Sequence, residues 1–279
     1  MKNYKTGILF WFLTLSVLFI SCSVERDLAK EFVRNNKDIP VLLQITDKII
    51  LTNEKLKKIK GFDTLSVEKQ DSLWFSNTLY LDSINDSNIL NLIFNSMETK
   101  LKAYGFHVYS IDNIADFDTL SKRKYSFNIA QVEISEDEFV YRDEEVFFTN
   151  LIYYQDNKLN VININGWFEF SDISERKEKV FYNTATISDL LNGSFVMDQH
   201  DYSVSYKYNI TPIKVDEIYL LASKSAQKYA GLFHDYLINQ YIKENLPHNY
   251  SDSKYFSLDP NTGFIYNNEN ERFTIIEPE

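Results

Sequence analysis

The sequence predicts an α+β fold in which a mainly antiparallel sheet is covered by two main helices. An apolar strand, an amphipathic helix and a second strand follow one another between positions 41 and 109, an order that predicts one β-α-β unit. Between positions 125 and 210, segments that alternate apolar and polar residues predict a four-stranded antiparallel meander. From 216 to 246, apolar residues recur at helical spacing and predict a long C-terminal helix.

The helix of the β-α-β unit is expected to begin after Asp86 or Ser87, because either side chain can cap a helix N-terminus. Gly105 stands directly after its last apolar residue, and Phe106 follows, a pair typical of a helix C-terminal cap. We therefore expect Gly105 to adopt a positive φ. The apolar face of this helix comprises Ile89, Leu90, Leu92, Ile93, Met97, Leu101 and Tyr104.

The strands of the meander are expected over 125–134, 162–170, 180–187 and 204–210. The alternation changes phase near Ile129, which predicts a β-bulge there. The acidic residues between 135 and 145 are interpreted as a solvated charged loop. A calcium site was the alternative, but the stretch lacks both the ligand spacing and the glycine of a calcium-binding loop.

The long C-terminal helix is expected to be capped by Asp216 and to end before Pro247. A stripe along it is predicted to pack on the meander: Leu221, Ser225, Tyr229, Phe233 and Leu237. The turn residues 259–263 then predict a terminal hairpin, followed by a strand through 273–276.

The N-terminus has the pattern of a secretion signal. Lys2 and Lys5 precede an apolar run over 8–20, which is too short to span a bilayer and ends at Ser21-Cys22. The run Phe19-Ile20-Ser21-Cys22 resembles a bacterial lipobox, although Phe19 stands where leucine is usual. That resemblance implies cleavage before Cys22 and acylation of Cys22 with fatty acids such as palmitate. The alternative is an ordinary signal peptide, which would leave one free or intermolecularly bonded thiol in a secreted chain.

These observations predict four regions of the chain. Residues 1–21 are the signal peptide, 22–38 a lipid tether, 39–247 a single α+β domain and 248–279 a C-terminal hairpin extension. We expect an exported protein that is lipid-anchored in the bacterial cell envelope, most simply at the outer membrane.

Composition limits the classes of partner. Hydrophobic residues make up 44% of the chain, enough to build a core rather than a disordered tail. The formal charge of −11 disfavours nucleic-acid binding, because both surfaces would carry the same sign. With one cysteine in the chain, no internal disulfide can form.

No catalytic, metal-binding or cofactor-binding motif stands out in the sequence. His234-Asp235 is the nearest approach to a catalytic pair, but neighbours on a helix point in different directions, and we expect Asp235 to face away from the core. Glycine-rich nucleotide loops and zinc spacings are not found. The aromatic residues Trp167, Tyr202, Tyr206 and Tyr208 could line a carbohydrate or peptide surface, but alternating aromatics more often form ordinary sheet faces.

Four triplets resemble the Asp-Ser/Thr-aliphatic acceptor of the O-glycosylation system of Bacteroidota. Their acceptor residues are Thr64, Ser72, Ser83 and Thr119, and the first three fall in an excursion over 53–87 that is expected to be exposed. The order of elements is similar to the α/β domain of outer-membrane lipoproteins of the curli-secretion and penicillin-binding-protein-activator kind. The lipobox and the Lys/Asn/Ile/Tyr-rich composition resemble uncharacterised Bacteroidota lipoproteins. No motif carries the first resemblance residue by residue, and the second family has no assigned activity, so neither assigns a catalytic or ligand-binding residue.

The sequence therefore predicts an envelope lipoprotein with a non-enzymatic binding or scaffolding role, whose partners are the membrane, through its anchor, and an envelope protein. The competing hypothesis is a hydrolase of envelope glycans or peptides. A concave pocket lined by convergent His, Asp or Glu would favour the enzyme, whereas an exposed aromatic patch or sheet edge would favour the binding protein.

Overall fold

The computed structural model describes residues 24–35, 37–147, 151–175, 177–247, 254–268 and 274–276. They form two compact units: the smaller combines the described residues up to 37 with those within 231–271, and the larger combines those within 38–230 with 274–276. The first division lies next to the expected boundary at 38/39. The second falls inside the long helix, rather than after it at 247/248. Among the described residues, no helix is both long enough and apolar enough to cross a membrane.

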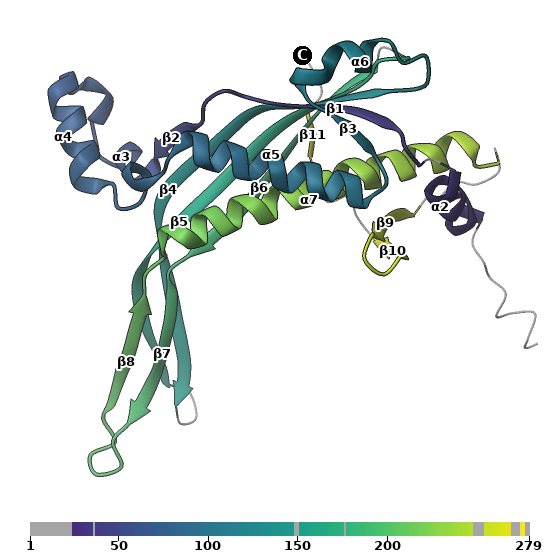
Figure 1. Ribbon diagram of the computed structural model, residues 1–279. Helices are drawn as coiled ribbons and strands as arrows, with labels where there is room; N and C mark the ends of the chain where they lie inside the picture. The colour runs from purple at the N-terminus through teal and green to yellow at the C-terminus, as the bar shows by residue number, and fades with distance from the viewer. Residues whose placement is uncertain are drawn as a thin grey trace, which may run out of the picture. The chain divides into compact units, whose positions relative to one another are not determined.

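The larger unit is built on a seven-stranded mixed sheet, so the expected α+β class is confirmed (Figure 1). Its strand order is β11-β6-β5-β4-β1-β3, and β2 also pairs with β4. The pairs among β4, β5, β6 and β11 are antiparallel, whereas β1 and β2 lie parallel to β4. The strands of this sheet are β1 (Pro40–Ile45), β2 (Ile50–Asn53), β3 (His107–Tyr109), β4 (Tyr125–Phe147), β5 (Leu151–Asp172), β6 (Lys177–Ser188) and β11 (Thr274–Ile276).

The predicted β-α-β unit is present as β1, α5 (Asp86–Ala103) and β3, with β1 and β3 parallel. Asn85 caps the helix, one residue before the expected Asp86 or Ser87, because its extended backbone lets its side chain accept from the Asn88 N–H at 2.9 Å. Gly105 has φ +92°, as predicted. The Phe106 N–H reaches the Leu101 carbonyl at 3.2 Å, which closes the C-terminal cap.

The excursion between β2 and α5 holds short helices, namely α3 (Glu54–Lys57), η1 (Phe62–Thr64), α4 (Val67–Asn77) and η2 (Leu81–Ser83). After β3, η3 (Ile111–Asn113) and α6 (Ile114–Asp118) lead into β4.

The predicted four-stranded meander is wrong in its last member. β4, β5 and β6 follow one another as predicted, and the register shifts between Ile129 and Gln131 at the expected bulge. However, β8 (Val204–Thr211) pairs with β7 (Leu190–Met197) in a separate two-stranded sheet. The place beside β6 is taken by β11, where Ile275 lies opposite Phe181. The predicted strand over 273–276 is therefore confirmed as β11.

The acidic stretch that was interpreted as a solvated loop is strand instead. β4 and β5 stay paired from Tyr125↔Asp172 to Phe147↔Leu151, so residues 135–145 continue the ladder. Beyond the region where β2 and β6 pair with them, these two strands form a ribbon that projects past the sheet together with the β7–β8 ribbon (Figure 1). We call this projection the arm: residues 137–147 and 151–160 together with β7 and β8.

Helix α7 (Val215–Asn245) contributes its residues up to Ala230 to the larger unit, and it begins one residue before the expected cap Asp216. The Tyr229 ring lies 5.1 Å from that of Phe168 on β5, and its hydroxyl donates to the Asn183 carbonyl at 3.3 Å. A Cβ on Gly166 would lie 2.7 Å from that hydroxyl, so the glycine permits this approach. At Tyr229 the predicted packing of the helix on the meander is confirmed.

The smaller unit contains α2 (Val24–Asn35), the end of α7 from Gly231, and the predicted hairpin of β9 (Tyr255–Asp259) and β10 (Phe264–Asn268). Phe32 of α2, within the expected tether, is buried against His234. The Asn239 side chain bonds both the N–H and the C=O of Phe256, at 2.8 and 2.7 Å. Phe233 and Leu237 of the predicted stripe are buried residues of this unit.

The expectation that Asp235 faces away from the core is wrong. Its side chain is buried, and it accepts a hydrogen bond from the Leu258 N–H at 3.1 Å. Burial lowers the pKa of the neighbouring His234, while the Asp235 carboxylate acts in the opposite direction. The pair is therefore part of the packing between the end of α7 and the terminal hairpin.

Candidate functional site

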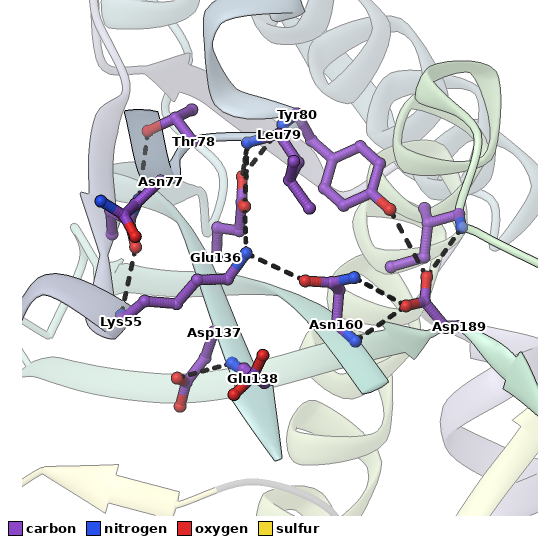
Figure 2. Close-up of polar contacts among 12 residues, drawn as sticks. Lys55, Asn77, Thr78, Leu79, Tyr80, Glu136, Asp137, Glu138, Asn160 and Asp189 are labelled. Atoms are coloured by element: carbon purple, nitrogen blue, oxygen red, sulfur yellow. Dashed lines mark hydrogen bonds and ion pairs between the residues drawn. The ribbon is translucent and has the colours of Figure 1, made fainter. Parts of the chain in front are cut away.

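A buried carboxylate lies where the sheet becomes the arm. The Glu136 side chain is inaccessible to solvent, although it sits in the acidic stretch. It accepts hydrogen bonds from the backbone N–H groups of Leu79 and Tyr80, each at 3.0 Å, and from the Lys55 ammonium at 2.6 Å (Figure 2). A charge held out of water needs such partners, because its desolvation otherwise costs several kcal/mol.

The network continues from Lys55 to a second buried carboxylate, Asp189. Lys55 donates to the Asn160 side-chain oxygen at 2.9 Å, and both the backbone and the side-chain nitrogen of Asn160 donate to Asp189 Oδ2 at 2.8 Å. Asp189 Oδ1 accepts from the Ile213 N–H at 3.0 Å and from the Tyr80 hydroxyl at 3.4 Å (Figure 2). The network thereby joins the segment before α5 to strands β4 and β5. It also includes Asp189, where the chain enters β7, and Ile213, just after the chain leaves β8.

Tyr80 acts in this network as a hydrogen-bond donor. Burial, followed by the nearby Asp189 charge, raises the pKa of Tyr80 to about 12, so the phenol keeps its proton at neutral pH. Because both carboxylates are buried and hydrogen-bonded, we interpret the network as the joint that fixes the root of the arm. We call it the root network: Lys55, Tyr80, Glu136, Asn160 and Asp189.

A cavity of about 570 Å³ opens between the β4–β5 ribbon and β7, and its lining includes Leu159 and Ser188, the chain neighbours of Asn160 and Asp189. Asp143 is the acidic group in its lining, and it accepts a hydrogen bond from the Tyr206 hydroxyl of β8 at 2.9 Å. Burial, reinforced by Asp143, raises the pKa of Tyr206. The lining residues are Phe139, Tyr141, Asp143, Leu159, Ser188, Leu191, Asn192 and Gly193.

Aromatic side chains hold the two ribbons of the arm together. The Tyr206 ring lies 4.7 Å from that of Phe195, which in turn contacts Phe147 and Tyr153 at 6.4 Å. Gly193 makes room for Tyr206, because a Cβ at this position would collide with the tyrosine hydroxyl. Most of these rings lie on the face of each ribbon that meets the other, so they form a small core for the arm.

The aromatic residues singled out in the sequence are divided between two places. Trp167 lies on the main sheet beside Tyr182 of β6, with ring centroids 4.9 Å apart. Tyr206 and Tyr208 stack on β8 at 5.7 Å, and Tyr202 precedes that strand with φ +59°. The two parts of the hypothetical carbohydrate or peptide surface thus lie on separate sheets.

The predicted lipidation residue, Cys22, and the signal peptide lie outside the described residues. The four candidate glycosylation acceptors are all exposed: Thr64 in η1, Ser72 in α4, Ser83 in η2 and Thr119 just after α6. Thr64 and Thr119 donate to backbone carbonyls at 2.7 and 2.8 Å. Within the described ranges, no group of three or more His, Cys, Asp or Glu side chains is arranged to hold a metal ion.

Sequence reasoning missed the root network, although one signal for Glu136 was present. Val132 and Ile134 are both buried, and a two-residue period places Glu136 on the same face of β4. The partners Lys55 and Asp189 could not be found in this way, because they lie 81 residues before Glu136 and 53 after it in the chain.

No protein-family model and no curated protein matches the chain. Among solved structures, the chain is similar to a neuraminyllactose-binding hemagglutinin homolog from Helicobacter pylori. The two share 9% sequence identity, and the alignment covers 75% of this chain and 90% of the other at a TM-score of 0.34. A likeness at this level carries no argument about function.

Proposed function

We propose that the protein is a lipoprotein of the bacterial cell envelope, anchored at the outer membrane through Cys22, that binds an envelope protein partner in the cavity of the arm. The cavity is the observation that carries the binding role. Its volume of about 570 Å³ falls within the range of roughly 300–1,000 Å³ common for ligand sites. Apolar and polar groups share its lining, and the polar groups would orient a bound partner.

The lining favours binding over the hydrolase alternative. Phe139, Tyr141, Leu159 and Leu191 supply apolar surface, and Asp143 supplies a carboxylate already bonded to Tyr206. A hydrolase would need a nucleophile or bound water next to a general base, with a third group to orient them. The buried carboxylates Glu136 and Asp189 are engaged with backbone N–H groups and are thus suited to support rather than to catalysis.

The anchor is tested by fractionation. We expect Cys22→Ser to move the protein from the membrane fraction to the soluble fraction, because the acyl chains would be lost. A wild-type protein that fractionates as soluble, or whose Cys22 thiol reacts with a thiol reagent, would contradict the lipoprotein proposal.

Binding is tested with two neighbouring substitutions on β7. Leu191 lines the cavity, whereas the adjacent Leu190 is 67% exposed and points to the other face of the ribbon. A photo-crosslinking residue at Tyr141, which lines the cavity from β4, would be used in intact cells, and its products identified by mass spectrometry. We expect Leu191→Trp to remove the cross-linked partner by filling the cavity, and Leu190→Trp to preserve it. Cross-links that survive both substitutions would exclude the cavity as the binding site.

A further inference from the structure

Among the described residues of the arm, the side that faces the cavity carries acids and no basic side chain. Side chains alternate between the two faces of a strand, so Tyr141, Asp143 and Glu145 lie on the same face of β4. Tyr141 and Asp143 line the cavity, and Glu145 is exposed. By the same alternation, the basic residues of the arm all lie on the outward faces of its two ribbons. They are Arg142, Lys158 and Lys207.

Asp143 has no cationic partner within the described ranges. Its Oδ2 accepts a hydrogen bond from the Tyr206 hydroxyl at 2.9 Å, and no lysine or arginine of those ranges forms an ion pair with it. The residues opposite Asp143 and Tyr141 on β5 are the neutral Gln155 and Asn157. A carboxylate has about four lone-pair sites for hydrogen bonds, so Asp143 can accept further donors from a molecule in the cavity.

The outward face of the same ribbon shows which group such a pair of side chains binds. Tyr154 and Asp156 stand two residues apart on β5, as Tyr141 and Asp143 do on β4. The Arg142 guanidinium forms two hydrogen bonds with the Asp156 carboxylate, at 2.6 and 2.8 Å, and lies 4.6 Å from the centre of the Tyr154 ring. On the outward face the chain itself supplies the arginine. On the cavity face the same tyrosine–aspartate pair has no arginine among the described residues.

On the basis of the protein-binding role proposed above, we propose that the cavity receives an arginine side chain of the envelope protein partner. The guanidinium donates to Asp143 and lies against the Tyr141 ring, while its methylene stem contacts Leu159 and Leu191. Arginine is favoured over lysine, because its planar guanidinium bonds a carboxylate and stacks on a ring at the same time, whereas an ammonium is a compact, strongly hydrated charge.

The spacing lets one guanidinium make both contacts. Side chains two residues apart on a strand start roughly 7 Å from each other, and a cation is attracted by an aromatic ring within about 6 Å of its centre. Tyr141 is 45% exposed, and its neighbour on the same face, Phe139, is 38% exposed, so both rings offer surface to the cavity. The negative potential of Asp143 and Glu145 attracts a cation and repels an acidic segment.

The test uses three short capped peptides as probes, which differ only in a central arginine, citrulline or lysine between two glycines. Citrulline has nearly the shape of arginine but carries no charge. Saturation-transfer NMR measures the dissociation constant of each peptide from the purified full-length protein in detergent micelles. The titrations are made at low ionic strength, because salt screens charges that remain partly exposed.

We expect the arginine peptide to bind on the order of 10–100-fold more tightly than the citrulline peptide, the effect of a hydrogen bond to a charged group. Asp143→Asn should remove this preference, because asparagine keeps an acceptor for the Tyr206 hydroxyl but loses the charge. Glu144→Gln is the matched control. It removes the same charge from the next residue, on the outward face, and should retain the preference.

A second variant leaves Asp143 in place. Tyr141→Leu keeps an apolar side chain in the lining but removes the ring, and it should weaken binding of the arginine peptide by roughly 2–5-fold. Equal binding of the arginine and citrulline peptides to the wild-type protein would overturn the proposal. So would a preference that survives in Asp143→Asn, because the cation would then bind elsewhere on the acidic chain. A lysine peptide that binds as tightly as the arginine peptide would overturn the choice of arginine.

The cross-linking experiment in cells separates this proposal from the protein-binding role. Cross-links that are lost in Leu191→Trp but kept in Asp143→Asn would leave the cavity as a protein-binding site and remove arginine recognition from it. If no protein is cross-linked from the cavity of the wild-type arm, the protein-binding role itself fails. Cross-links that are lost in both variants and kept in Glu144→Gln are the result expected if the partner inserts an arginine.

Discussion

Replacing Glu136 by glutamine tests whether the root network holds the arm in place. The change keeps the shape of the side chain but replaces one carboxylate oxygen by an NH₂ group, which must face a donor. Glu136 Oε1 accepts from Lys55, and Oε2 accepts from the Tyr80 N–H. In either orientation of the amide, one of these donors loses its acceptor in a site that water does not reach.

The size of the effect follows from burial. Breaking a buried ion pair by removing one partner costs about 3–5 kcal/mol, and an orphaned buried donor costs about 1–3 kcal/mol. The Lys55 side chain is 15% exposed and can recover part of its hydration, which favours the lower end of the first range. We therefore expect Glu136→Gln to lower the free energy of unfolding of the larger unit by about 3 kcal/mol.

The assay is urea unfolding, with Glu138→Gln as the matched control. Glu138 lies two residues further along β4, but its ion pair with Lys158 is exposed, at 37% and 72% for the two side chains. Its loss should cost less than about 1 kcal/mol. Adding Lys55→Met to Glu136→Gln should recover part of the loss, because both charges are then absent. Equal unfolding midpoints for Glu136→Gln and Glu138→Gln would refute the assigned role of the network.

Two further substitutions test the capping of α5 and the correction made for Asp235. Gly105→Val should lower the free energy of unfolding by about 1–2 kcal/mol, because a β-branched residue would be forced to φ +92°; a melting temperature like that of wild type would show that the cap adds nothing. Asp235→Asn should destabilise the smaller unit by about 1–3 kcal/mol, since the charged acceptor of the Leu258 N–H is lost. Hydrogen exchange at the Leu258 amide measures the loss of this hydrogen bond directly. Unchanged protection of that amide in Asp235→Asn would contradict the buried role of Asp235.

The local features of the fold were predictable because each depends on neighbours in sequence. Gly105 after an apolar helical face indicates a C-terminal cap, and the structure gives it a positive φ. The phase change near Ile129 indicates a bulge, and the register shifts there. The turn residues 259–263 indicate a hairpin, and β9 pairs with β10 around them.

Strand partners were not predictable in the same way. Alternation over 204–210 identifies a strand but contains no information on its partner, so β8 was placed beside β6 instead of β7. The strand that occupies the place beside β6 is β11, which lies far along the chain and pairs Ile275 with Phe181. The arm was missed for a related reason. In a ribbon that projects from a sheet, charged residues remain solvated on a strand, and their composition then resembles that of a loop.

Glu136 and Glu138 show why the candidate site itself could be only partly predicted. Both stand on the same face of β4 in the same acidic stretch, so every local rule treats them alike. The difference arises because the backbone of Leu79 and Tyr80 covers Glu136, whereas Glu138 lies beyond that cover. A carboxylate becomes a structural joint when distant segments supply its donors, and that property belongs to the assembled chain. The root network, which supports the arm and its cavity, could therefore be recognised only in the folded structure.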